Sequence, residues 1–165
     1  MVIYLVRHGI AMAREDPECP PDPERRLTQK GIARTREVAE AVKEMGVKPD
    51  LLLSSPYLRA LETAEIFAAE FDYPKERIKK TDALRVGARP AAIFRELTGA
   101  RAEQVMCFGH APHLDEAIAM ACGAGEPFTA LKKGGVACLE MERLTPPRAQ
   151  LAWIVTPKLL RALAG

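Results

Sequence analysis

The sequence predicts an α/β fold of three layers, in which helices cover both faces of a mostly parallel sheet. Short apolar runs alternate along the chain with segments of helical periodicity, which is the pattern of such a fold. Near the end, two apolar runs are joined by a proline turn instead of a helix, which predicts an antiparallel edge strand. With 165 residues, 48% of them hydrophobic, we expect a single domain over residues 1–165.

Five segments have the composition of buried strands. In the first three the apolar residues are continuous rather than alternating, as in parallel strands covered on both faces. The last two are joined through Pro146-Pro147, which predicts a hairpin. The expected strands are Val2 to Val6, Leu51 to Leu53, Val105 to Phe108, Val136 to Met141 and Gln150 to Val155.

Capping signals predict four helices between these strands. Thr28 can cap the first helix, which Gly46 ends, and Ser55 followed by Pro56 is a start signal for the second. Pro90 opens the third and Pro112 the fourth. The residues expected to face inward are Ile32, Ala39, Val42 and Met45, then Leu58, Leu61, Ala64 and Ala68, then Ile93, Phe94 and Leu97, and finally Leu114, Ile118 and Ala121.

Composition excludes several classes of function. The net charge is only +2 and no basic block is present, so no nucleic-acid partner is expected. The apolar run from Met1 to Val6 is too short for a signal peptide or a membrane span, so no membrane partner is expected. The four cysteines form no C-x-x-C pair, which favours reduced thiols and a cytoplasmic location. They are Cys19, Cys107, Cys122 and Cys138, and we expect only Cys19 to be reachable by solvent.

Two loops have open roles. Arg14 to Arg26 contains four prolines and many charges, and Ala124 to Gly134 follows the fourth helix. Each can be a plain connection or a rim that recognises substrate.

Basic and imidazole side chains follow three of the expected strands. Arg7, His8 and Gly9 follow the first strand, Ser55 and Arg59 follow the second, and His110 follows the third. Because ligands of such sheets bind at the carboxyl ends of the strands, we expect these residues to meet in one pocket.

The residue types in this pocket suit a phosphoryl group. Arginine offers a planar fork of donors to phosphoryl oxygens, and a neutral imidazole is a competent nucleophile. Gly9 would let the backbone approach the ligand, and the Thr63 hydroxyl could steady the Arg59 guanidinium one turn before it. His8, His110 and His113 lack metal-site spacing, so no metal or other cofactor is expected, and His113 is expected to cap a helix or lie at the surface.

These motifs resemble those of the histidine phosphatase superfamily. Arg7-His8-Gly9 matches its R-H-G signature, Leu27-Thr28-Gln-Lys-Gly31 its L-T-x-x-G, Ser55 to Ala64 its S-x-x-x-R-A-x-x-T-A, and Gly109-His110-Ala-Pro112 its G-H-x-P. The resemblance implies a phosphoglycerate-mutase-like fold and catalysis by His8, Arg7, Arg59 and His110, with His8 phosphorylated. It also implies substrate binding by Arg7, Gly9, Ser55, Arg59, Thr63 and His110, without a metal.

Within the superfamily, the short chain is most similar to the SixA-type phosphohistidine phosphatases. Relatives that hydrolyse esters carry an acidic residue after the third β segment, where this chain has Val86, with Asp82 nearby as an alternative acid. An alkoxide leaving group needs that acid, whereas a phosphohistidine does not. We therefore expect a phosphatase that dephosphorylates a His-phosphorylated signalling protein, such as a histidine phosphotransfer domain.

Two other functions remain open at this stage. One is a small-molecule phosphomonoesterase or phosphosugar mutase of the same superfamily, and the other is a non-catalytic phosphoprotein-binding module. In each case phosphate, sulfate, vanadate or tungstate should occupy the pocket.

Overall fold

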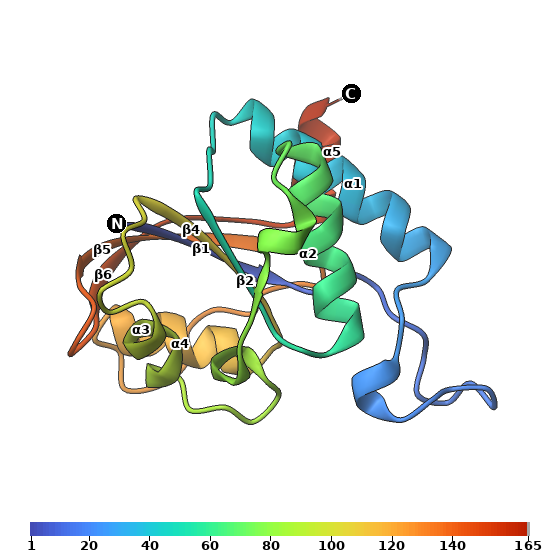
Figure 1. The fold of residues 1–165 in the computed structure, drawn as a ribbon, viewed down its shortest axis with the longest axis horizontal. Helices are drawn as coiled ribbons and strands as arrows, with labels where there is room; N and C mark the ends of the chain where they lie inside the picture. Colours follow the sequence, from blue (N-terminus) through green and yellow to red (C-terminus); the bar gives the residue numbers. More distant parts are fainter. Residues whose placement is uncertain (165) are drawn as a thin grey trace.

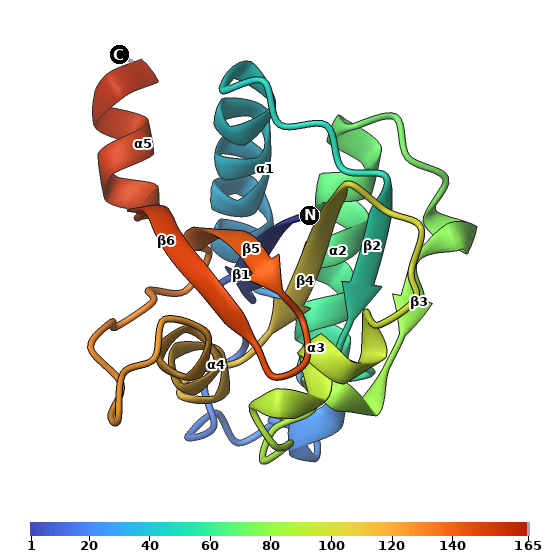
Figure 2. The ribbon, with the colours of Figure 1, turned by 90° about the vertical axis from the view of Figure 1, so that its left-hand side faces the viewer.

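The computed structural model describes residues 1–164 and contains one six-stranded sheet with the strand order β3-β2-β4-β1-β5-β6. Strands β1 to β4 are parallel, whereas β5 runs antiparallel to β1 and β6 antiparallel to β5. Figure 2 shows the sheet from β6 on the left to β3 on the right. The strands are β1 (Val2–Arg7), β2 (Leu51–Ser54), β3 (Lys79–Lys80), β4 (Gln104–Gly109), β5 (Val136–Arg143) and β6 (Arg148–Val155).

Helices cover both faces of the sheet, which confirms the expected three layers. Helices α1, α2 and α5 lie on one face, and α3 and α4 lie on the other (Figure 1). The helices are α1 (Gln29–Glu44), α2 (Leu58–Glu70), α3 (Ala91–Glu96), α4 (His113–Ala121) and α5 (Pro157–Ala164), with short 3-10 turns η1 (Asp22–Glu24), η2 (Lys75–Arg77) and η3 (Asp82–Leu84).

The central strands are apolar on both faces because each face packs against a helical layer. Val6 and Phe108 belong to the core beneath α1 and α2, whereas Leu5 and Cys107 belong to the core above α3 and α4. This two-sided burial explains the continuous apolar runs in the sequence. It also leaves the carboxyl ends of β1, β2 and β4 at one edge of the sheet.

The helix signals are partly correct. Thr28 caps α1 by accepting a hydrogen bond from the Gly31 N–H at 3.0 Å. Ser55 does not cap α2, which begins three residues later at Leu58 with Tyr57 in the capping position. Met45 was expected inside but is 47% exposed as the residue that ends α1, and Val38 is buried on that helix.

Strand β3 and helix α5 were not expected from the sequence. All four cysteines are free, and Cys107 and Cys138 are buried, but Cys122 is partly exposed, as is Cys19. Within residues 1–164, no helix has the length and apolar character needed to cross a membrane.

Candidate active site

The structure brings the four proposed catalytic side chains to one cavity at the carboxyl edge of the sheet. His8 directly follows β1, His110 directly follows β4, and Arg59 lies in the first turn of α2. Together with Arg7 they line a cavity of about 490 Å³. His8, Arg59 and His110 are each less than 7% exposed, so a group bound here would be largely removed from water.

His8 is held as a neutral imidazole with a defined tautomer. Its Nδ1 donates to the carbonyl oxygen of Gly9 at 2.7 Å, so Nε2 bears the lone pair and accepts from Nε of Arg59 at 3.3 Å. Burial, together with the Arg59 and Arg7 guanidiniums, lowers the pKa of His8 to about 3, although the bond to Gly9 opposes this shift. Nε2 is therefore unprotonated at neutral pH, which is the state in which an imidazole can act as a nucleophile.

His110 lies beside His8, with the ring centroids 5.3 Å apart. Its Nε2 lies 2.8 Å from the Ser55 hydroxyl oxygen, and that oxygen accepts from the Tyr57 N–H at 3.2 Å, which leaves the Ser55 O–H to donate to Nε2. With Nε2 accepting from Ser55, Nδ1 bears the proton of the neutral ring; it is buried and has no partner within the described residues, so it can donate to a ligand oxygen. Burial and the neighbouring His8 and Arg59 lower the pKa of His110 to about 3.

Ser55, Thr63 and Gly9 lie behind the cavity and not in its wall. The Thr63 hydroxyl donates to the Arg59 carbonyl oxygen at 2.7 Å and accepts from the Gly9 N–H at 3.0 Å. The expected contact between Thr63 and the Arg59 guanidinium is therefore not formed. Glycine is needed at position 9 because a Cβ atom there would collide with the Thr35 hydroxyl on α1. The three residues therefore join β1, α1, α2 and β4 around the cavity.

Asp22 and Arg25, which sequence reasoning missed, belong to the site. Arg59 donates from Nη1 to the Asp22 carbonyl oxygen at 2.8 Å and from Nη2 to the Asp22 carboxylate at 3.2 Å. The same carboxylate accepts from Nε of Arg25 at 2.9 Å. Burial alone would raise the pKa of Asp22, but the Arg59 and Arg25 guanidiniums lower it below its usual value. The loop from Arg14 to Arg26 is therefore part of the site and not a plain connection.

The loop from Ala124 to Gly134 holds the other arginine. Nη1 of Arg7 donates to the Leu131 carbonyl oxygen at 2.9 Å. The Asp115 carboxylate, buried on α4, accepts from the Leu131 N–H at 2.9 Å and from the Thr129 hydroxyl at 2.6 Å. Asp115 is a third residue that the sequence did not indicate, and only its place in an apolar helix could have pointed to a role.

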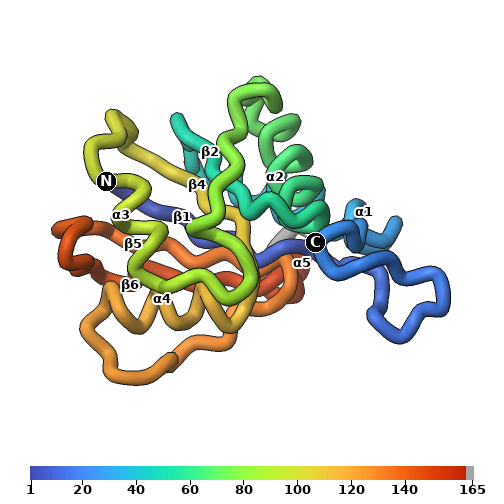
Figure 3. Tube along the Cα trace, turned by 60° about the horizontal axis from the view of Figure 1, so that its bottom comes forward, coloured from blue at the N-terminus to red at the C-terminus, as the bar shows by residue number. Residues whose placement is uncertain are grey.

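The rim of the cavity carries mixed charge. Val86 lines it, as do Arg14, Glu15, Arg25 and Lys133. Asp82 does not line it, and its side chain is 81% exposed and ion-paired with Arg85 at 3.7 Å. Figure 3 shows the chain between β1 and α1 projecting away from the body of the molecule.

His113 is neither exposed nor in the cavity wall. It is 3% exposed at the start of α4, and its Nε2 lies 3.4 Å from the Arg89 carbonyl oxygen. The expectation of a surface position for this residue was wrong, because the segment before α3 covers it. Residues 1–164 contain no group of three or more His, Cys, Asp or Glu side chains placed to hold a metal.

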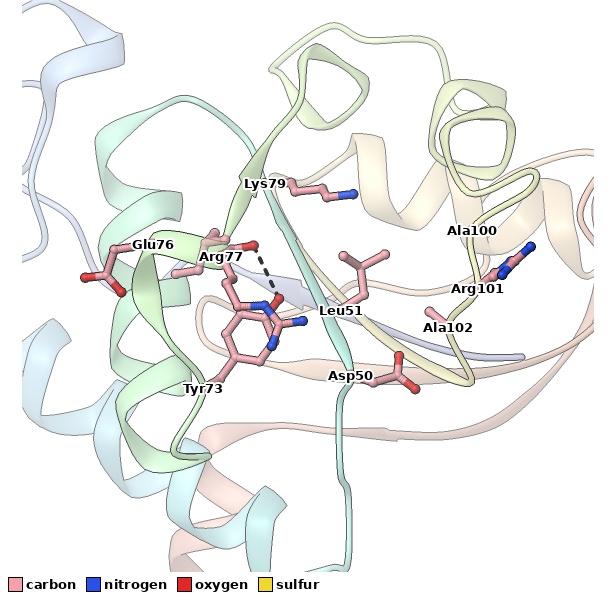
Figure 4. A pocket seen from close by; sticks show the side chains of 10 residues that line it. Asp50, Leu51, Tyr73, Glu76, Arg77, Lys79, Ala100, Arg101 and Ala102 are labelled. Atoms are coloured by element: carbon pink, nitrogen blue, oxygen red, sulfur yellow. Dashed lines mark hydrogen bonds between the residues drawn. The ribbon is translucent and has the colours of Figure 1, made fainter.

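A second cavity, of about 430 Å³, lies at the opposite edge of the sheet, where β2 and β4 begin (Figure 4). Asp50 in its wall accepts hydrogen bonds from the Glu103 and Gln104 N–H groups at 2.9 and 3.4 Å, which is a structural role. The Arg77 guanidinium stacks on the Tyr73 ring. Among the described residues, no imidazole or thiol lines this cavity.

Comparison with known proteins agrees with this geometry. Residues 3–85 match the profile of the histidine phosphatase superfamily (branch 1), so the chain belongs to that superfamily. An uncharacterized protein of Picosynechococcus is 39% identical over 139 residues, which are 82% of each chain. The mitochondrial serine/threonine-protein phosphatase Pgam5 of Drosophila persimilis is 35% identical over 86 residues, which are 52% of this chain and 28% of that protein.

Solved structures share the fold over nearly the whole chain. The protein histidine phosphatase SixA complexed with tungstate superposes with a TM-score of 0.84 at 23% identity, covering 97% of this chain and 99% of that one. A mycobacterial glucosyl-3-phosphoglycerate phosphatase with inorganic phosphate gives 0.73 at 14% identity, covering 95% and 98%. The fold is thus the phosphoglycerate-mutase-like fold that the motifs implied, and these structural neighbours are phosphatases.

Proposed function

We propose that this chain is a phosphohistidine phosphatase that acts on a phosphorylated protein through a phospho-His8 intermediate. The observation that carries the proposal is the state of His8: a buried imidazole, neutral at pH 7, whose Nε2 is directed at the Arg59 guanidinium. A phosphoryl group bound between Arg7, Arg59 and His110 would place its phosphorus beside that lone pair.

The reaction would proceed in two displacements. Nε2 of His8 attacks phosphorus as the bond from phosphorus to the substrate imidazole breaks, and that imidazole leaves neutral after taking a proton from water on its ring. Water then attacks the phosphorus of phospho-His8, releasing inorganic phosphate and restoring Nε2. In both steps the guanidiniums and Nδ1 of His110 stabilise the charge on the equatorial oxygens.

The side chain at position 86 favours phosphohistidine over an alkyl ester. Val86 is 46% exposed and lines the cavity, so it can face a leaving group but cannot protonate it. Asp82, the nearby carboxyl, does not line the cavity and forms an exposed ion pair with Arg85. A neutral imidazole leaves without a protein acid, whereas an alkoxide does not.

A second candidate is a small-molecule phosphomonoesterase. It is favoured by Glu15, whose side chain lies in the cavity wall and could protonate an alkoxide. The fold likeness extends to a phosphoserine phosphatase of Entamoeba histolytica, with a TM-score of 0.71 at 16% identity. Glu15 sits on the loop before α1, so its approach to a leaving group depends on that loop.

The test compares kcat/KM for a phosphohistidine protein and for an alkyl phosphate. We expect the first to be larger by a factor on the order of 10²–10⁴, the usual worth of a general acid. His8→Ala should abolish both activities and prevent acid-labile phosphorylation of the enzyme. Glu15→Gln separates the two candidates, because it should leave phosphohistidine turnover unchanged if the chain is a phosphohistidine phosphatase. If esters are the better substrates of the wild type and Glu15→Gln selectively loses ester turnover, the phosphomonoesterase is favoured.

Three further expectations belong to this proposal. Phosphate, sulfate, vanadate or tungstate should bind in the cavity, whose arginines and imidazoles attract anions and disfavour a divalent cation. Activity should therefore survive a chelator. The partner would be a cytoplasmic phosphoprotein, such as a histidine phosphotransfer domain, whose modified imidazole projects from a helix. A binding module without catalysis would bind the same anions and never form phospho-His8.

A further inference from the structure

Arg25 is a buried charge to which the proposed reaction assigns no role. It is 8% exposed, while the next residue in the chain, Arg26, is exposed. Its Nε donates to the Asp22 carboxylate at 2.9 Å and its Nη1 donates to the Met12 carbonyl oxygen at 2.7 Å. Burying a guanidinium costs free energy, which must be offset by hydrogen bonds and opposite charge. For Arg25 these come from the two bonds above, or from these bonds together with a further partner.

The guanidinium of Arg25 belongs to the same cavity as the nucleophile. Arg25 lines that cavity together with Arg7, His8 and Arg59. Its positive charge is one of those that lower the pKa of His8. Nη2 donates no hydrogen bond within residues 1–164, which leaves one arm of the fork for a ligand oxygen.

Asp22 sets the spacing between Arg25 and Arg59. One carboxylate oxygen accepts from Arg25 at 2.9 Å and lies 3.4 Å from Arg14, and the other accepts from Arg59 at 3.2 Å. The main-chain oxygen of Asp22 also accepts from Arg59 at 2.8 Å. The turn η1 therefore joins two guanidiniums from distant parts of the chain through a single residue.

Arg25 is the buried one among the further cations of the cavity. The Asp22 carboxylate, bonded directly to Arg59, offsets one of the two positive charges of Arg7 and Arg59, so these two alone would under-compensate a phosphoryl dianion. The wall of the cavity also contains Arg14, Arg25 and Lys133, with Glu15 as an opposing charge. Arg14 and Lys133 are exposed to water, whereas Arg25 is 8% exposed, so the charge of Arg25 is the least screened of the three.

We propose that Arg25 is a third guanidinium of the phosphoryl-binding cavity, with its Nη2 donating to a phosphoryl oxygen, and that Asp22 is the positioning residue that holds Arg25 and Arg59 at a fixed spacing. This inference rests on the proposed function only in that the cavity accepts a phosphoryl group. It needs no particular leaving group.

The test measures binding of orthovanadate and of inorganic phosphate by calorimetry, without turnover. Arg25→Gln should weaken binding by about 10- to 100-fold, the worth of one charge-assisted hydrogen bond. Arg26→Gln is the matched control: it makes the same charge change at the next residue, whose partner is Glu62 on the outside of α2, and should stay within about twofold of wild type. Equal affinities for the two variants would overturn the role of Arg25.

Two further variants keep the test decisive. If Arg25→Gln does not fold, Arg25→Lys retains the charge but cannot bind Asp22 and the anion with one planar fork, so it should bind more weakly than Arg26→Lys. Unchanged affinity in Arg25→Lys would then refute the proposal. If the wild type binds neither anion, the assignment of a phosphoryl-binding cavity is wrong, and so is the proposed function. If Arg25→Gln binds and turns over normally, only the role assigned to Arg25 is wrong.

The sign of the effect at Asp22 separates positioning from simple charge. Removing a carboxylate beside an anion site should strengthen anion binding if only charge mattered. We expect the opposite for Asp22→Ala, a loss of about 3- to 30-fold, since both guanidiniums lose their common acceptor. Asp22→Asn keeps an acceptor oxygen and should recover most of the affinity, and Glu24→Gln on the same turn is the control. Tighter binding in Asp22→Ala would contradict the positioning role.

Discussion

Acidification from pH 7 to pH 5 should destabilise the fold through the two histidines of the site. Both are nearly inaccessible to water, at 6% and 2% exposure, and burial is the first cause that lowers their pKa values to about 3. In the unfolded chain each imidazole returns to the ordinary histidine pKa of 6.5. The unfolded state therefore binds protons that the folded state excludes, and stability is lost as the pH falls below about 6.5.

The size of the loss follows from the same values. With pKa values of about 3 folded and 6.5 unfolded, each histidine removes roughly 2 kcal/mol of unfolding free energy between pH 7 and pH 5. His8 and His110 together would remove about 4 kcal/mol, a large part of the roughly 5–15 kcal/mol that stabilises an ordinary domain. The Asp22 carboxyl, whose pKa is lowered, stays ionised in this range and adds nothing to the loss.

The assay is urea unfolding at pH 7 and at pH 5, followed by circular dichroism. His8→Gln and His110→Gln should each remove roughly 2 kcal/mol of the difference between the two pH values, since glutamine does not titrate, and His113, whose pKa burial also lowers, contributes to the remainder. Saturating phosphate should raise the stability at pH 5, because it binds only the folded state. Equal unfolding free energies at the two pH values in the wild type, or an undiminished difference in both variants, would refute the assignment of neutral buried imidazoles.

Two further predictions concern residues behind the cavity. Ser55→Ala removes the oxygen that lies 2.8 Å from Nε2 of His110, so kcat should fall by about 10-fold with little change in KM. Ser55→Thr keeps a hydroxyl and should recover part of the lost kcat. An unchanged kcat of Ser55→Ala in steady-state assays would show that Ser55 does not orient the His110 ring. Asp115→Ala removes the acceptor of the Leu131 N–H, and the carbonyl of Leu131 is the acceptor for Arg7. The free energy of unfolding should therefore fall by about 2 kcal/mol, and the affinity for vanadate should fall as well. A loss of stability without a loss of affinity would show that Asp115 does not support the site.

The sequence was sufficient for five of the six strands of the sheet and for the core of the candidate site. Continuous apolar runs identify buried strands because such strands face helices on both sides, and the residues after those runs are the ones that meet at the carboxyl edge. His8, Arg59 and His110 could be placed in this way without knowing any distance. Of the two elements that sequence analysis missed, β3 lacks such a pattern because it is two exposed lysines, whereas α5 is an amphipathic segment that begins at Pro157 and had a detectable signal.

Tertiary structure alone decided which polar residues serve the cavity. Asp22 and Arg25 lie in a proline-rich charged loop whose composition is that of a solvated connection, and only the fold brings that loop against Arg59. The sequence pattern at Ser55 predicted a helix cap, but its hydroxyl is bonded to His110, which follows a different strand, β4. Periodicity reports burial along one element, whereas a hydrogen bond between distant segments depends on how whole elements pack, and that information is absent from any local pattern of residues.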